Sequence, residues 1–292
     1  MGELFYTVSD KYDNATVQTF LRRGCGVSAR LLARLKRVDN GITADGIHVR
    51  SIDRLRAGQR IVLRMPPDIP RVEGVEIPLL VVYEDEDVIV VDKPSGLAVH
   101  PSSGHTEPTL AAAVIAHHAT LGARLSFRPI NRLDRNTSGL LLAAKNPHAA
   151  NLLNGHTSKE YHAIVLGRME GEGVIEQPIR NKEGFGITRE VGVGGKYCLT
   201  RWWSLAATDN ISLLRVIIDT GRTHQIRVHM SWMGHPLAGD TMYGKDSELI
   251  PRHALHCSRL SFDHPVSKNT MEFISQIPSD MNALLRGFGI KE

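Results

Sequence analysis

The sequence has 292 residues and a net charge of +4, with 42% hydrophobic and 23% charged residues, which is typical of a globular chain with one or two domains. Its apolar runs are far shorter than the roughly 20 residues of a membrane-spanning helix, and three dispersed cysteines without a CxxC pair exclude a disulfide framework and a cysteine zinc site. The N-terminus lacks the pattern of a secretory signal, so we expect a cytoplasmic protein that does not bind membranes.

Positive charge is concentrated near the N-terminus. Residues 14–65 carry eleven basic and three acidic side chains, a net charge of +8, so the rest of the chain carries −4. Such a step in charge is expected when one module binds a polyanion, although a solvated helix face produces the same pattern. The chain average therefore hides a candidate binding surface.

This basic segment is predicted to contain two short helices followed by strands. Apolar residues recur at helical spacing, Ser28 is a candidate N-cap, and residues 39–41 and 45–46 form turn signals. The arrangement resembles the S-four-like RNA-binding domain, and the resemblance covers residues 14–66. It implies RNA contacts from four cations of the second helix, which are Arg30, Arg34, Lys36 and Arg37.

A proline-rich stretch at residues 66–70 is predicted to be a stiff linker to a second domain, residues 71–292. This larger domain alternates β-branched stretches with helical segments, and strands outnumber helices. Strands are predicted near residues 87–91, 161–166, 202–206 and 213–218, and helices near residues 110–121, 148–154 and 223–233. The connections are too irregular for strand-helix-strand units, so the pattern favours an α+β fold with a mixed, largely antiparallel sheet.

The first polar cluster of the larger domain, residues 130–139, precedes an apolar run that predicts a buried strand. Catalytic groups often lie on such loops, because the adjacent strand holds them rigidly. Asp134 stands between two arginines, which favour its ionised form, and a carboxylate in this setting can act as a nucleophile, a base or a metal ligand. The alternative is a structural aspartate that pairs with an arginine or caps a turn.

The second polar cluster, residues 220–230, predicts a helix that Thr223 caps and Gly234 ends. His224 and Arg227 are three residues apart and share one face of this helix. The alternative is a surface helix whose arginine makes an ordinary ion pair. No acidic or cysteine ligand completes a metal set with the histidines, so no metal is expected.

The two clusters resemble signatures of the RluA-type pseudouridine synthases, RLDRNTSG at residues 132–139 and GRTHQIRVH at residues 221–229. Further similar stretches follow in the family's order, namely DKPSG at 92–96, VHP at 99–101, KEY at 159–161, GHPL at 234–237, GD at 239–240, YG at 243–244, LH at 255–256 and HP at 264–265. The resemblance implies that a uridine within RNA is detached from its sugar through nitrogen and rejoined through carbon, without cofactor or metal. Asn131 departs from the family, which has histidine there, so support of the loop or an RNA contact differs.

The resemblance also implies roles for individual residues. Asp134 is the essential carboxylate, which attacks the sugar, attacks the uracil ring or assists a glycal route, and Arg227 pairs with it. Tyr161 packs against the target base, with an ordinary core tyrosine as the alternative. Arg132 enters the RNA where the base leaves, and Arg135 and His224 contact phosphates or bases.

The expected partner is structured RNA, first ribosomal RNA and alternatively transfer RNA, and the chain is expected to be a monomer without an obligate protein partner. One rival is a non-catalytic RNA-binding protein, which would lack Asp134 or Arg227, whereas both are present. A second rival is a metal-dependent nuclease, which needs a carboxylate cluster that the two signatures do not supply.

Overall fold

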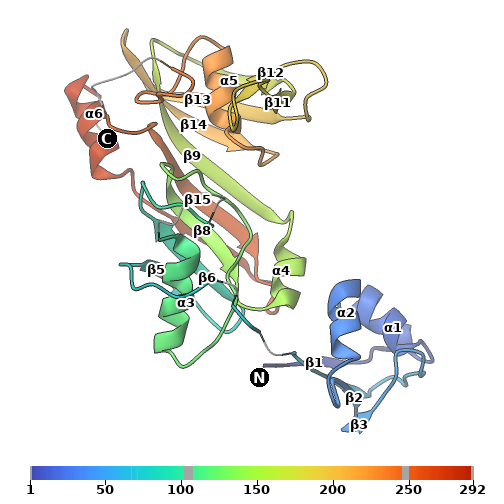
Figure 1. The fold of residues 1–292 in the computed structure, drawn as a ribbon. Helices are drawn as coiled ribbons and strands as arrows, with labels where there is room; N and C mark the ends of the chain where they lie inside the picture. Colours follow the sequence, from blue (N-terminus) through green and yellow to red (C-terminus); the bar gives the residue numbers. More distant parts are fainter. Residues whose placement is uncertain (1, 67, 71, 102–107, 245–249, 291–292) are drawn as a thin grey trace.

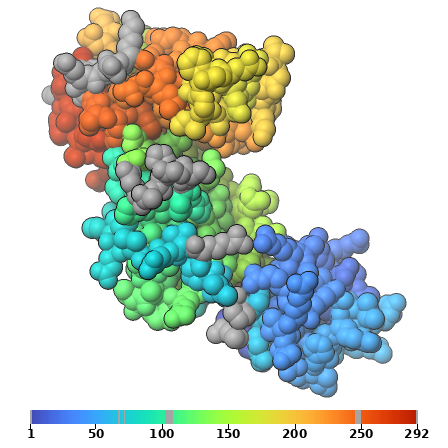
Figure 2. Space-filling view, in the orientation of Figure 1, coloured from blue at the N-terminus to red at the C-terminus, as the bar shows by residue number. Residues whose placement is uncertain are grey.

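The computed structural model describes residues 2–66, 68–70, 72–101, 108–244 and 250–290. Figure 1 shows a small N-terminal lobe and a long sheet that runs through the larger remainder of the chain. In the space-filling view of Figure 2, this lobe lies against one end of the larger body. Each part has its own cluster of buried apolar side chains, so the chain has separate packing units.

The N-terminal lobe combines an antiparallel sheet, in the order β1-β4-β2-β3, with short helices. Its strands are β1 (Glu3–Thr7), β2 (Ile42–Ala44), β3 (Ile47–His48) and β4 (Arg60–Arg64), and its helices are η1 (Asp10–Tyr12), α1 (Val17–Thr19), η2 (Phe20–Gly24) and α2 (Ala29–Leu35). The Ser28 hydroxyl caps α2 by accepting the Leu31 N–H at 3.1 Å, as predicted. Because β1 pairs along the whole of β4, the lobe extends to residue 3, before the predicted start at residue 14.

The linker and the lobe are both fastened to the larger domain. Pro67 and Arg71, at the predicted boundary, lie outside the described residues. Between them, the Asp68 carboxylate accepts from Arg128 Nη2 at 2.6 Å. From the lobe, Tyr6 Oη lies 2.8 Å from His148 Nε2. These contacts attach the lobe and the linker to the larger domain near α4 (Pro147–Leu153).

The larger domain is built on one sheet in the order β10-β13-β14-β9-β15-β8-β6-β5, with β16 paired to β15 and β7 paired to β8. Its strands are β5 (Leu80–Glu84), β6 (Val88–Lys93), β7 (Arg128–Pro129), β8 (Ser138–Ala144), β9 (Thr157–Leu166), β10 (Glu172–Glu176), β13 (Leu199–Ala207), β14 (Ile211–Ile218), β15 (Leu255–Asp263) and β16 (Thr270–Ile274). Among the described strands, β15 and β8 form the parallel pair and the other pairs are antiparallel. The predicted α+β fold with a largely antiparallel sheet is confirmed.

Helices and a small ribbon complete the larger domain. They are α3 (Leu110–Thr120), α4, α5 (Gln225–Trp232), α6 (Ser279–Gly287) and the ribbon of β11 (Ile179–Asn181) with β12 (Arg189–Val191). In Figure 1, α5 lies beside this ribbon, and α6 lies near the C-terminus. Within the described ranges, no helix combines the length and the apolar character that crossing a bilayer requires.

Candidate active site

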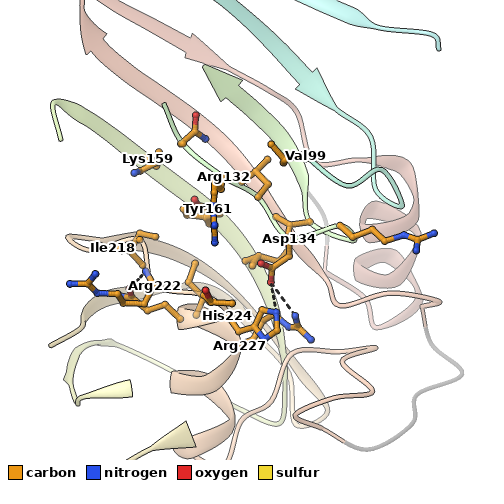
Figure 3. Close-up of a pocket in the computed structure, with 18 of the residues that line it drawn as sticks. Val99, Arg132, Asp134, Lys159, Tyr161, Ile218, Arg222, His224 and Arg227 are labelled. Atoms are coloured by element: carbon orange, nitrogen blue, oxygen red, sulfur yellow. Dashed lines mark hydrogen bonds and ion pairs between the residues drawn. The ribbon is translucent and has the colours of Figure 1, made fainter. Parts of the chain in front are cut away.

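Asp134 lies on the loop between β7 and β8 and faces the pocket shown in Figure 3. The Thr137 N–H donates to the Asp134 carbonyl at 3.1 Å, and the Thr137 hydroxyl lies 2.8 Å from His253 Nε2. Arg252 donates to the Asn136 carbonyl at 3.2 Å. Because Arg252 and His253 lie two to three residues before β15, these bonds hold the loop near the start of that strand and give the carboxylate a defined position.

Asn131 supports the same loop from its other end. Its amide nitrogen donates to the Leu140 carbonyl at 3.2 Å, and its amide oxygen accepts the Leu142 N–H at 2.8 Å. The side chain thus completes backbone hydrogen bonds of β8 and is buried. Asn131 is the residue at which the sequence departs from the family that it resembles. In the structure, its side chain supports the loop.

Gly139 allows β8 to approach β15 closely. Its φ is +108°, and an added Cβ would lie 2.3 Å from the Cys257 carbonyl oxygen. These two residues are parallel partners in the sheet. Because no larger side chain fits here, this glycine lets the strand after the Asp134 loop enter the centre of the sheet.

Arg227, on α5, joins two carboxylates. Its Nη1 donates to Asp134 Oδ2 at 3.0 Å, while Nε and Nη2 donate to Asp240 Oδ2 and Oδ1 at 2.7 and 2.9 Å. Burial opposes ionisation of Asp240, but the hydrogen bonds and charge of Arg227 outweigh it and hold the pKa of Asp240 below its usual value. The two-point pairing with Asp240 fixes the guanidinium plane, so its remaining arm is aimed at Asp134.

The start of α5 differs from its prediction. The helix begins at Gln225, and its N-cap is His224 rather than Thr223. The backbone of His224 is left-handed, with φ 59°. Helical spacing in the sequence gives no indication of such a residue at the start of a helix. Gly234, with φ +84°, follows the end of the helix as predicted.

Tyr161 and Lys159 come from alternate positions of β9 and therefore share one face of the sheet. Both line the pocket with Asp134, and Figure 3 shows them on its strand-lined wall. Tyr161 is buried, and burial raises its pKa well above the usual value, so the phenol is neutral. The sequence predicted Tyr161 in the site but gave no role to Lys159. The signal that could have found Lys159 is its spacing of two residues from Tyr161 in a strand, which places both side chains on one face.

Lys93 is a second residue without an assignment from the sequence. It is fully buried, and its ammonium donates to the carbonyls of Pro94, Leu97 and Arg135 at 2.8, 2.9 and 3.0 Å. Burial lowers the pKa of Lys93 to about 7, against the opposing effect of Asp134. One side chain thereby ties the turn after β6 to the loop that carries Asp134.

Five of the seven residues predicted to contact RNA line one of two hollows. Arg132, Arg135 and His224 line the Asp134 pocket, which has a volume of about 600 Å³. Arg30 and Arg34 line a second, adjoining groove of about 1090 Å³ between the N-terminal lobe and the larger domain. The exposed side chains of Lys36 and Arg37 line neither hollow.

The described residues contain one group with the ligand types and spacing of a metal site, formed by Asp85, Asp87 and His264. His264 Nδ1 accepts the backbone N–H groups of Val266 and Ser267, so the ring proton is on Nε2, which lies 2.9 Å from Asp85 Oδ2. A protonated ring nitrogen is a donor and cannot ligate a metal. The cluster is therefore accounted for by its own hydrogen bonds.

Comparison with known proteins agrees with this geometry. Residues 87–232 match the model of a family described as RNA pseudouridylate synthase. The chain is 37% identical over 270 residues to an RNA pseudouridine synthase of Bacillus subtilis (strain 168) named YjbO, covering 90% of this chain and 95% of that protein. It is 35% identical to the ribosomal large subunit pseudouridine synthase D of Pseudomonas aeruginosa, covering 85% of this chain and 83% of the other.

Solved structures show the same similarity. Human RNA pseudouridylate synthase domain containing 1 superposes with a TM-score of 0.56 and 28% sequence identity, over 70% of this chain and 86% of the human chain. Human RNA pseudouridylate synthase domain containing 4 superposes with a TM-score of 0.60, over 73% of this chain and 94% of the other, at 21% identity. The second similarity concerns the fold alone.

Proposed function

The chain belongs to the RNA pseudouridylate synthase family, and we propose that it isomerises uridines of ribosomal RNA to pseudouridine with Asp134 as the essential carboxylate. The observation that carries the assignment of Asp134 is its position in a pocket, held through Arg227 to the buried Asp240. In the reaction, the bond from uracil N1 to C1′ of the sugar breaks and a bond from C5 to C1′ forms. The hydrogen on C5 is lost, and N1 gains a proton, so atoms and charge balance without a redox partner.

Asp134 serves this reaction through its free oxygen. Arg227 occupies Oδ2, and within the described residues Oδ1 has no hydrogen-bond donor. Attack on the sugar, attack on the ring and assistance to a glycal route all require such an anionic oxygen close to the nucleotide. Arg227 Nη1 donates to the carboxylate that each of these routes uses.

The pocket supports a base that has left the RNA stack. Its volume of about 600 Å³ lies in the range of sites that enclose small molecules. Tyr161 on the wall offers an aromatic surface to the uracil, a contact worth about 1–3 kcal/mol. Arg132, exposed at the pocket, is positioned to occupy the space that the base vacates.

The N-terminal lobe is proposed to be an S-four-like RNA-binding domain that strengthens this binding. Its net charge of +8 over residues 14–65 would neutralise phosphates, and Arg30 and Arg34 line a groove that continues toward the larger domain. The groove shares His100 and Ile130 with the Asp134 pocket. RNA bound to the lobe would therefore lie close to the reaction site.

Neutralising the lobe should weaken RNA binding without changing the chemical step. In a variant with Arg30→Gln, Arg34→Gln, Lys36→Gln and Arg37→Gln, we expect RNA affinity to fall by about tenfold or more at moderate salt, and the slope of log K against log salt to decrease by about 0.7 per lost phosphate contact. Filter binding across a salt series measures both quantities. The control is Arg286→Gln on α6, which should bind as the unmodified protein does, and an unchanged salt slope in the fourfold variant would refute the role of the lobe.

The proposed substrate is tested by mapping pseudouridines in ribosomal and transfer RNA from cells with and without the gene. We expect at least one ribosomal pseudouridine to disappear on deletion and to return with the intact gene but not with Asp134→Asn. If pseudouridines were lost from transfer RNA alone, transfer RNA would be the substrate instead of ribosomal RNA. If no pseudouridine were lost from either RNA, the proposed function would be refuted. The protein is further proposed to act as a monomer in the cytoplasm.

A further inference from the structure

His224 has a backbone conformation that helices do not use. Its φ of 59° and ψ of 20° lie in the left-handed region, where residues other than glycine are uncommon. The buried side chain of Gln225 holds this turn, because its Oε1 accepts from the Thr220 hydroxyl at 2.7 Å and from the Arg222 N–H at 3.1 Å. Residues kept in such sparsely populated conformations cluster at functional sites.

This conformation brings the imidazole to Asp134. His224 Nε2 lies 3.8 Å from Asp134 Oδ2, the same oxygen that accepts from Arg227 Nη1 at 3.0 Å. In Figure 3, His224 and Arg227 both lie beneath the carboxylate. The His224 side chain is only 8% exposed, which leaves little surface for the RNA contact expected from the sequence.

Tyr243 determines which nitrogen of His224 carries the proton. The Tyr243 oxygen accepts the Arg189 backbone N–H at 2.8 Å and lies 2.7 Å from His224 Nδ1. Within the described residues, Nδ1 is the acceptor available to the phenol proton, and burial raises the pKa of Tyr243, so this proton is retained. Burial also lowers the pKa of His224, which favours neutral imidazole. A neutral ring that accepts at Nδ1 carries its hydrogen on Nε2, facing Asp134.

We propose that His224 is a positioning residue for Asp134, donating Nε2–H to Oδ2 beside Arg227 so that Oδ1 faces the uridine. The gap of 3.8 Å exceeds a hydrogen bond, and contacts of this kind often tighten only when substrate binds. The inference rests on the proposed function and adds to it how the carboxylate is oriented. The other charged or titratable groups that act on Asp134 or His224 are Lys93, Tyr161, Arg189, Asp240 and His253.

Two amide substitutions separate this role from an RNA contact. Glutamine at residue 224 places an N–H donor near the position of Nε2, whereas the shorter asparagine tolerates the left-handed backbone but reaches only the position of Nδ1. In single-turnover assays with saturating RNA, we expect His224→Asn to slow isomerisation by about 10²-fold and His224→Gln to recover at least about tenfold of that loss. RNA affinity should change by less than about threefold in both variants.

Equal rates in the unmodified protein and in the His224→Gln and His224→Asn variants would overturn the inference, as would unchanged rates with weakened RNA affinity. Tyr243→Phe removes the hydroxyl that directs the tautomer, and we expect a rate loss intermediate between those of His224→Gln and His224→Asn. A measurement independent of activity is the nitrogen-15 NMR spectrum of the histidines in the unmodified protein. We expect His224 as the Nε2–H tautomer, and an Nδ1–H tautomer would overturn the inference whether or not the substrate is ribosomal RNA. Absence of isomerisation by the unmodified protein would refute the proposed function instead.

Discussion

Asp134→Asn is expected to reduce pseudouridine formation by on the order of 10⁴-fold or more, with RNA affinity within about threefold of the unmodified protein. The amide has nearly the same size and its oxygen still accepts from Arg227 Nη1, so the pocket keeps its shape. It has no anionic oxygen, however, and cannot attack the sugar or the ring or assist removal of a proton. Release of tritium from RNA labelled at uracil C5 measures the reaction, because that hydrogen leaves when C5 joins the sugar.

The matched control for this substitution is Asp209→Asn. Asp209 is an exposed aspartate that pairs with Arg168 on the surface, 2.9 Å away, and the same change there should leave both rate and affinity intact. Turnover by Asp134→Asn above about one hundredth of the unmodified rate would contradict the assignment of the carboxylate. Loss of RNA binding in that variant, with the fold retained, would instead assign Asp134 to recognition.

Arg227→Ala is expected to reduce the rate by about 10²–10³-fold and the free energy of unfolding by about 3–5 kcal/mol. The two losses have different causes. Asp134 loses the donor that holds Oδ2, which affects the reaction. Asp240, whose side chain is completely buried, loses the partner that pairs with both of its oxygens, and this stranded charge affects stability.

A double variant separates these causes. Arg227→Ala combined with Asp240→Ala removes the stranded charge, so we expect it to regain part of the lost stability while remaining as inactive as the single variant. Arg227→Lys keeps a positive charge but lacks the planar fork and cannot bridge both carboxylates in this geometry. Urea unfolding and tritium release measure the two quantities. A double variant that regains activity, or a single variant of unchanged stability, would contradict the role of Arg227 as a bridge.

The architecture could be predicted from the sequence because most strands of the sheet have local patterns of β-branched and apolar residues. The stretches predicted as strands at residues 87–91 and 161–166 correspond to β6, which runs from residue 88 to 93, and to β9, which begins earlier, at residue 157. Strand β1 was missed, since residues 3–7 form a short segment of alternating burial whose place depends on pairing with β4, far along the chain. Local periodicity cannot specify such a distant partner.

Part of the site was also predicted from local sequence patterns. Asp134 and Arg227 lie in dense polar clusters, and the family resemblance placed them together, as the structure shows. Asp240 and Tyr243 lie in stretches that resemble the family, but they received no role, because the contacts that define their roles are made across the fold. The left-handed turn at His224 was likewise hidden, since helical spacing describes only residues within a regular helix.

The attachment of the lobe has a consequence for the choice of uridine. Asn151 of α4 donates to the Gly26 carbonyl at 3.0 Å, and Tyr6 reaches His148 on the same helix. With these contacts in place, the basic helix α2 and the Asp134 pocket have a set separation, and we expect this separation to determine which uridine is modified. Given the RNA binding proposed for the lobe, the uridine would be selected by its distance along the folded RNA from the element that the lobe contacts, and lengthening this spacer in the RNA would move the modification to a different nucleotide.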